Sequence, residues 1–322
     1  MRRSVIIAGN FLLLSSALSW GMSAVATEPV RFDLNSGHAD AALSSLNSAL
    51  ARDPGDAEAH NLRCRVFYEE QLWDAAVADC EAAVRQAPGD SNFHLWLGRA
   101  YGQKADHISL VAAYKLARKT GAEFQQAVQL DPRNADALSD LGEFDVDAPS
   151  MVGGGMGKAQ ALVPLLQAVN PAAAQTLQAH IAESRRDFAG AEASFRGAIA
   201  RSSYPAGAWM DLASFYRRRG RIDEMVAAVH AGAALDRHHG PALVDGAANL
   251  ALAHREPQTA ILWLQQYLAS SAQSEDAPVF VVRAQLAHLL NDQGDGLAAQ
   301  QQLAAARALA SGYRVQNAGA TR

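Results

Sequence analysis

Small and apolar residues recur along the chain in triplets, spaced by four and then by three residues. In the clearest copy, Ala76, Cys80 and Ala83 fall on one face of a predicted helix. Six later copies are Thr120, Phe124 and Ala127; Ala159, Val163 and Leu166; Ala191, Phe195 and Ala198; Met225, Val229 and Gly232; Ala260, Leu264 and Tyr267; and Ala299, Leu303 and Ala306. Each triplet predicts a helix whose face approaches a neighbouring helix closely.

Proline dipeptides predict where helices end. Asp53-Pro54, Ala87-Pro88, Asp131-Pro132 and Asn170-Pro171 each follow a helical stretch, and a residue before proline is disfavoured in the α conformation. Pro54 and Pro88 stand 34 residues apart, a length that accommodates two antiparallel helices. The chain is therefore predicted to be an all-α protein built from repeated helix pairs.

Residues of the first helix of each pair carry a family resemblance. The signatures are Trp96-Leu97-Gly98 with Tyr101, Leu138 with Leu141-Gly142, and Trp209 with Leu212-Ala213 and Tyr216. Together with the triplets they resemble the tetratricopeptide repeat (TPR) family, best over residues 57–90 and 206–239. The resemblance implies an α-solenoid, a right-handed superhelix of antiparallel helix pairs with about six full units plus a half. It divides the mature chain into a half unit (27–56), a solenoid (57–310) and a tail (311–322).

Two insertions interrupt the repeat, near residues 103–120 and 146–158. We expect them to emerge on the same edge of the solenoid and to touch each other. The second contains Pro149, Gly153, Gly154, Gly155 and Lys158, and is similar to a loop of secreted bacterial TPR proteins. Its glycines also resemble a phosphate-binding loop, but Ala159 stands where that loop needs Ser or Thr. A structural turn is predicted, with a weaker anion site at Lys158 as the alternative.

The N-terminus has the pattern of a secretory signal. Arg2 and Arg3 precede an apolar stretch from Val5 to Leu18, and Ala24-Val25-Ala26 matches a signal peptidase site. We expect residues 1–26 to be cleaved and the mature chain to be secreted or periplasmic, with no membrane span after cleavage. An uncleaved anchor is the alternative, although the apolar stretch is shorter than the roughly 20 residues that a spanning helix needs.

Composition narrows the possible functions. Lys and Arg number 28 against 33 Asp and Glu, giving a net charge of −5, which argues against nucleic acid as a partner. No spacing typical of a metal site and no nucleophile–base set is found. We therefore expect no enzyme activity, no cofactor and no metal. Cys64 and Cys80, the two cysteines, either form a disulfide or stay as buried thiols.

The family resemblance also implies which residues line the concave groove. The candidates are Asn61, Arg65, Tyr68, Asn92, Arg99, Gln103 and Glu143. Arg65 and Arg99 occupy the same position of adjacent units, so they are expected to stack on one wall and to hold a carboxylate or peptide. The alternative is that they pair with Glu58, Glu69 or Glu143.

The resulting functional hypothesis is an exported, non-catalytic scaffold or adaptor that binds a protein or peptide in the cell envelope. The alternative is a periplasmic small-molecule or solute-binding accessory protein of a transport or envelope assembly system. In that case an apolar cavity between the projecting helix and the glycine loop would hold the ligand.

Overall fold

The computed structural model describes residues 21–314, which form sixteen α-helices and one short 3-10 turn with no strand among them. The elements are α1 Gly21–Asn35, α2 Ala39–Arg52, α3 Ala57–Glu69, α4 Trp73–Gln86, α5 Ser91–Asp106, α6 Leu110–Leu130, α7 Ala135–Asp147, η1 Ser150–Val152, α8 Met156–Val169, α9 Pro171–Ser184, α10 Phe188–Arg201, α11 Pro205–Arg218, α12 Ile222–Leu235, α13 Pro241–Leu252, α14 Pro257–Ala269, α15 Val279–Asp292 and α16 Gly296–Leu309. The signal predicted at residues 1–26 lies mostly outside the described residues.

Helix boundaries follow the local sequence. The helices α2, α4, α6 and α8 end directly before the four predicted proline dipeptides, which confirms those stops. Polar side chains cap the next helices: Asp56, Asn134 and Asn170 each accept a hydrogen bond from a backbone N–H in the first turn that follows. Capping satisfies donors that have no partner within the helix.

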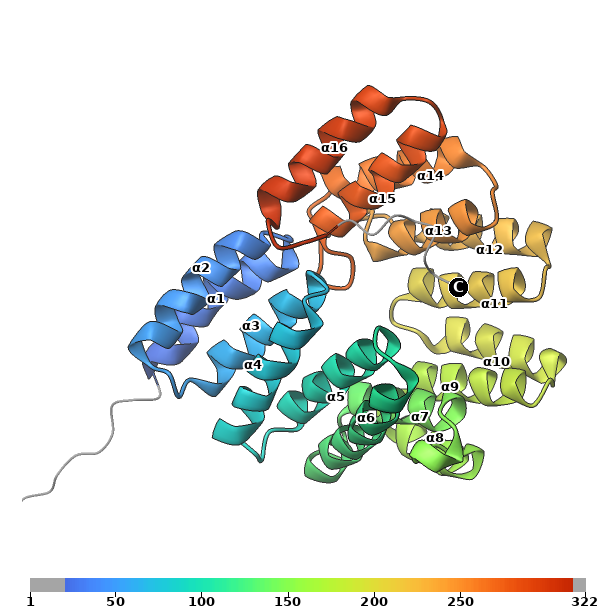
Figure 1. Ribbon diagram of the computed structural model, residues 1–322. Coiled ribbons are helices and arrows are strands. Elements are labelled where there is room, and N and C mark those ends of the chain that lie inside the picture. The colour runs from blue at the N-terminus through green and yellow to red at the C-terminus, as the bar shows by residue number, and fades with distance from the viewer. Residues whose placement is uncertain (1–20, 315–322) are drawn as a thin grey trace, which may run out of the picture.

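The helices pack as consecutive antiparallel pairs (Figure 1). Eight pairs are present in the described chain, from α1–α2 to α15–α16, which is more than the six and a half expected. The C-terminal copies of the triplet are faint, and α1 overlaps the predicted signal. The triplet residues do lie between helices, since Ala76, Cys80 and Ala83 are fully buried. No helix of the described chain is both long and apolar enough to cross a membrane.

The first and last helix pairs meet, so the solenoid closes into a ring (Figure 1). Phe280 of α15 and Ala306 of α16 share one buried cluster with Val30 and Leu34 of α1 and with Leu46 of α2. The ring of Tyr313 packs edge-on against Phe280, with 5.0 Å between the ring centroids. An open solenoid is held together by neighbouring units alone; this one gains an apolar joint between its two ends.

Polar contacts complete the joint. Ser311 donates from its backbone N–H and its hydroxyl to the carboxylate of Asp40, and the N–H of Gly312 donates to Glu70. Gly37, in a left-handed conformation at φ +66°, lies so close to α15 that an added Cβ would be 2.6 Å from the Val279 nitrogen. The first residues of the segment taken as a tail are therefore bound to the N-terminal helices.

Candidate functional site: the ring interior

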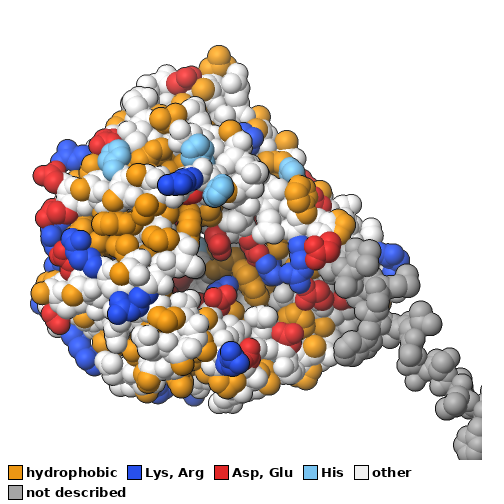
Figure 2. Space-filling view, turned by 180° about the vertical axis from the view of Figure 1, so that it is seen from behind, with side chains coloured by type: hydrophobic (Ala, Val, Ile, Leu, Met, Phe, Trp, Pro, Cys, Tyr) orange, Lys and Arg blue, Asp and Glu red, His pale blue; other side chains and the backbone are white. Residues whose placement is uncertain are grey.

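The inner surface of the ring is formed by the first helices of several pairs together with the connection 270–278. This surface, called the ring interior below, is contributed by α1, α3, α5, α7, α11 and α13. The connection 270–278 is the longest link between helices in the described chain, and it reaches across to α3. Figure 2 shows a recess near the centre of one face, bordered by acidic and apolar side chains.

The two predicted groove arginines stack on one aromatic ring. The guanidinium carbons of Arg65 and Arg99 each lie 4.9 Å from the Trp96 ring centroid. Arg65 forms a two-pronged ion pair with Glu275, in which its Nε donates over 2.7 Å. Arg99 donates from Nε to Asp140 over 2.6 Å.

The alternative prediction, that the two arginines pair with Glu58, Glu69 or Glu143, is wrong. Neither arginine forms an ion pair with any of the three in the described structure. The reason for Arg65 is ring closure, which brings Glu275 next to it across 210 residues of sequence. Both guanidinium groups already have a carboxylate partner, so they do not offer a free carboxylate-binding site. Their positive charge is largely neutralised within the protein.

A polar pocket of about 340 Å³ adjoins this stack. The predicted groove residues Asn61, Arg65, Asn92 and Arg99 line it, together with Trp96. Asn61 is only 3% exposed, and its Nδ2 group has no hydrogen-bond partner in the described structure. A buried donor without a partner costs about 1–3 kcal/mol, so a ligand acceptor at this position would be stabilising.

A second pocket of about 540 Å³ lies between α5, α6 and α7, and Arg99 belongs to both pockets. It brings together four predicted groove residues, Tyr68, Arg99, Gln103 and Glu143, with Pro149 of the insertion. Its remaining wall is partly aromatic: Phe124 of α6 and Phe144 of α7 pack edge to face at 6.4 Å. The groove and the insertion edge, proposed separately from the sequence, thus border one cavity.

The two insertions touch, as predicted. The hydroxyl of Tyr114 on α6 donates to the backbone carbonyl of Met151 over 3.2 Å. Gly154 packs against the end of α7, where an added Cβ would lie 2.0 Å from the Ala148 carbonyl oxygen. The ammonium group of Lys158 donates to the carbonyl of Gly153 over 2.6 Å. Lys158 therefore holds the loop in shape, as the structural turn requires.

Three carboxylates that face the ring interior, Glu143, Asp211 and Asp245, have raised pKa values. Burial, followed by the negative charges of Asp140, Asp147 and Asp211, raises the pKa of Glu143 to about 7. Burial and the neighbouring Asp245 raise the pKa of Asp211 to about 6. These side chains are exposed to solvent, but protein surrounds them inside the ring, which weakens the hydration of their charged forms.

Asp245 continues this row along α13. Its pKa is also raised to about 6, by burial and then by the negative charge of Asp276. At the joint, burial and Glu275 raise the pKa of Glu69 well above its ordinary value. Both Glu69 oxygens lack a hydrogen-bond partner in the described structure, which favours the neutral acid.

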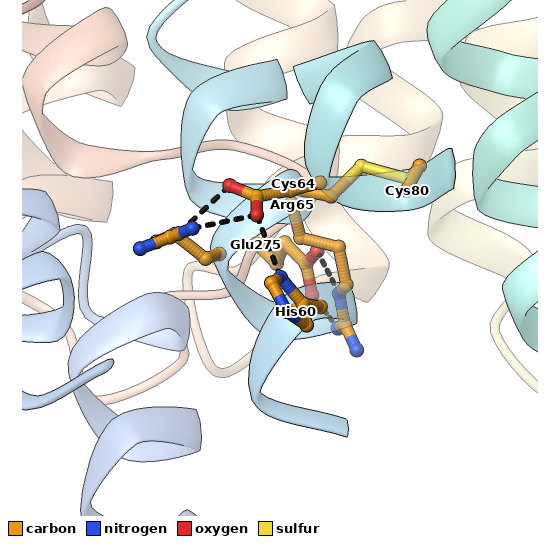
Figure 3. The surroundings of a disulfide bond; sticks show 7 residues. His60, Cys64, Arg65, Cys80 and Glu275 are labelled. Atoms are coloured by element: carbon orange, nitrogen blue, oxygen red, sulfur yellow. Dashed lines mark hydrogen bonds and ion pairs between the residues drawn. A yellow bond between two sulfur atoms is a disulfide. The ribbon is translucent and has the colours of Figure 1, made fainter. Parts of the chain in front are cut away.

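Cys64 of α3 and Cys80 of α4 form a disulfide with a Cα–Cα distance of 5.3 Å, and both are fully buried. The bond fixes the two helices of one pair directly beside Arg65 and Glu275 (Figure 3). The same helices are joined by Asp79, which accepts from Arg63 and contacts His60 at 2.8 Å. The part of the interior that carries Asn61 and Arg65 is therefore held rigidly.

Sequence reasoning missed Asp140, Asp211, Asp245 and Glu275. A signal existed for two of them, because Asp211 and Asp245 stand 34 residues apart, the length of one repeat unit, and so occupy equivalent positions on neighbouring first helices. Asp140 stands four residues after Asp136, one helical turn along the same face of α7, but this spacing was not used to place it in the groove. Glu275 had no sequence signal, because it lies in a connection between helices.

The chain is an α-solenoid, because it consists of helix pairs of similar length that pack one on the next. A family model described as tetratricopeptide repeat matches residues 33–91 and 176–234, so these two stretches of the chain are tetratricopeptide repeats. No curated protein matches the chain.

Solved structures show the same fold. A thermophilic TPR protein from Thermus thermophilus is similar with a TM-score of 0.50 and 19% identity, covering 59% of this chain and 98% of that one. Yeast Tom70 is similar with a TM-score of 0.52 and 15% identity, covering 84% of this chain and 55% of that one. At these identities the likeness concerns the fold. TPR folds generally serve as scaffolds that bind other proteins.

Proposed function

We propose that this chain is an exported, non-catalytic scaffold that binds a protein or peptide partner in its ring interior. The main support for this proposal is the presence of two adjoining pockets in the ring interior. One pocket of about 540 Å³ and one of about 340 Å³ share Arg99 and are lined by first-helix side chains. Anchored polar groups beside an aromatic wall are typical of surfaces that recognise peptides.

Two features support export to the cell envelope. The N-terminal pattern is that of a secretory signal, and the disulfide between Cys64 and Cys80 is of a kind that persists in oxidising compartments. Cleavage after Ala26 is compatible with the fold, because the buried α1 residues Val30 and Leu34 lie beyond the cleavage site. The mass of the protein recovered from the envelope fraction tests this step: loss of residues 1–26 is expected, and an intact N-terminus in the cytosol contradicts export.

Site-specific photo-crosslinking tests partner binding. A photoreactive amino acid replaces Gln103 inside the cavity, and the matched control carries it at Leu297, which is 71% exposed on α16. We expect a defined crosslinked product in living cells from position 103 and none from position 297. Equal products from both positions, or none from position 103, would contradict binding in the ring interior.

A further inference from the structure

The ring interior carries a row of carboxylates without cationic partners. This acidic wall consists of Glu143 and Asp147 on α7, Asp211 on α11, Asp245 on α13 and Asp276 in the connection 270–278. None of the five forms an ion pair within the described residues.

The nearby arginines already have carboxylate partners outside the acidic wall. Arg65 and Arg99 pair with Glu275 and Asp140, and Arg218 of α11 donates to Glu183 over 2.7 Å. Arg99 and Arg218 offset part of the negative charge of Glu143 and Asp211, but no side chain of the described chain forms an ion pair with the five carboxylates.

The acidic wall extends from α7 to α11, α13 and the connection 270–278, with no member on α9. The negative charges of Asp147 and Asp211 raise the pKa of Glu143. In the same way Asp245 raises the pKa of Asp211, and Asp276 raises that of Asp245. The raised pKa values of Glu143, Asp211 and Asp245 reflect burial together with this repulsion, which an external cation would relieve. In the described residues, no three His, Cys, Asp or Glu side chains are placed to hold a metal ion. The charge is spread along a wall, as an extended polycation would require.

Two independent features point to a peptide as the bearer of that positive charge. The Nδ2 donor of Asn61, nine-tenths buried and without a partner, lines the adjoining polar pocket; a peptide carbonyl is the acceptor it lacks. The larger pocket offers the aromatic side chains of Tyr68, Phe124 and Phe144 directly beside Glu143. Aromatic surfaces hold the aliphatic stems of Lys and Arg while their charged ends reach a carboxylate.

We propose that the ring interior binds an extended peptide segment rich in lysine or arginine. Its backbone carbonyl accepts from Asn61, its side-chain stems lie along the aromatic pocket wall, and its cationic ends meet Glu143, Asp147 and the rest of the acidic wall. An acidic segment is repelled by the same carboxylates. This inference rests on the proposed scaffold function and adds the chemistry of the partner.

The test uses fluorescent peptides of alternating lysine and alanine, glutamate and alanine, or serine and alanine, titrated with the mature chain in an anisotropy assay. We expect the lysine peptide alone to bind well, and its affinity to fall as salt is raised. Glu143→Gln combined with Asp147→Asn should weaken it by about tenfold, the size of one lost charge-assisted hydrogen bond. The matched control exchanges Asp223→Asn and Glu224→Gln on exposed α12, which should leave affinity unchanged.

Asn61→Ala separates peptide binding from simple charge attraction, because it removes the backbone contact without changing any charge. We expect weaker lysine-peptide binding with an unaltered salt dependence. Circular dichroism spectra that match the unaltered protein establish that each variant is folded.

Preference for the glutamate peptide, or equal loss of affinity in the α12 control, would overturn the inference. So would the absence of lysine-peptide binding. The scaffold proposal is judged separately by the natural crosslink at position 103, which can persist when all three peptides fail.

Discussion

Removing Phe280 should open the ring without dismantling the solenoid. Phe280 is fully buried in the cluster that joins α15 and α16 to α1 and α2. Replacing a buried Phe by Ala costs about 3–5 kcal/mol, whereas each hydrogen bond that Ser311 and Gly312 make at the same joint contributes about 1 kcal/mol. Together the three hydrogen bonds contribute about 3 kcal/mol, so the single Phe280 side chain is expected to contribute at least as much to closure as all of them.

Phe215→Ala is the matched control, because Phe215 is also fully buried but lies inside the stack. We expect Phe280→Ala to raise the radius of gyration in small-angle X-ray scattering and to speed amide exchange in α1, α2 and α16, with little loss of helical signal. Phe215→Ala should instead weaken α9–α14 and leave the joint intact. An unchanged radius and unchanged exchange at the termini in Phe280→Ala would refute closure by this contact.

Three further predictions concern the site and its support. Replacing Cys64 and Cys80 by Ala should lower the free energy of unfolding in urea by about 3 kcal/mol, the chain-entropy value for a loop of this size; an unchanged midpoint would contradict a formed disulfide. Gly154→Ala should displace the insertion loop and be seen as faster proteolysis there, while proteolysis elsewhere stays unchanged. Asp211 and Asp245 have raised pKa values in the folded state, so at mildly acidic pH the folded state binds more protons than the unfolded state. The melting temperature should therefore be higher at pH 5 than at pH 8. The double variant Asp211→Asn, Asp245→Asn should reduce this difference.

The architecture of single repeats could be predicted because it depends on local signals. Proline placement ended four helices at the expected residues, and the triplets identified the second helix of seven of the eight described pairs. Ring closure could not be predicted in this way. It depends on small rotations between successive pairs that add up around the whole chain, and no short motif encodes their sum.

The same distinction separates the predicted site residues from the missed ones. Tyr68, Gln103 and Glu143 were placed on the inner surface by their repeat position, and the structure brings them to one cavity. The partner of Arg65 was missed, because Glu275 reaches it only after the two ends of the chain have met.

Closure also limits how this protein can evolve. An open solenoid tolerates the duplication or loss of a unit, because its ends have no partners to lose. Here, a gained or lost helix pair would move Phe280 away from Val30 and Leu34 and leave apolar surface uncovered at both ends. Homologues that keep the joint should therefore hold the number of helix pairs constant while varying the lengths of their connections.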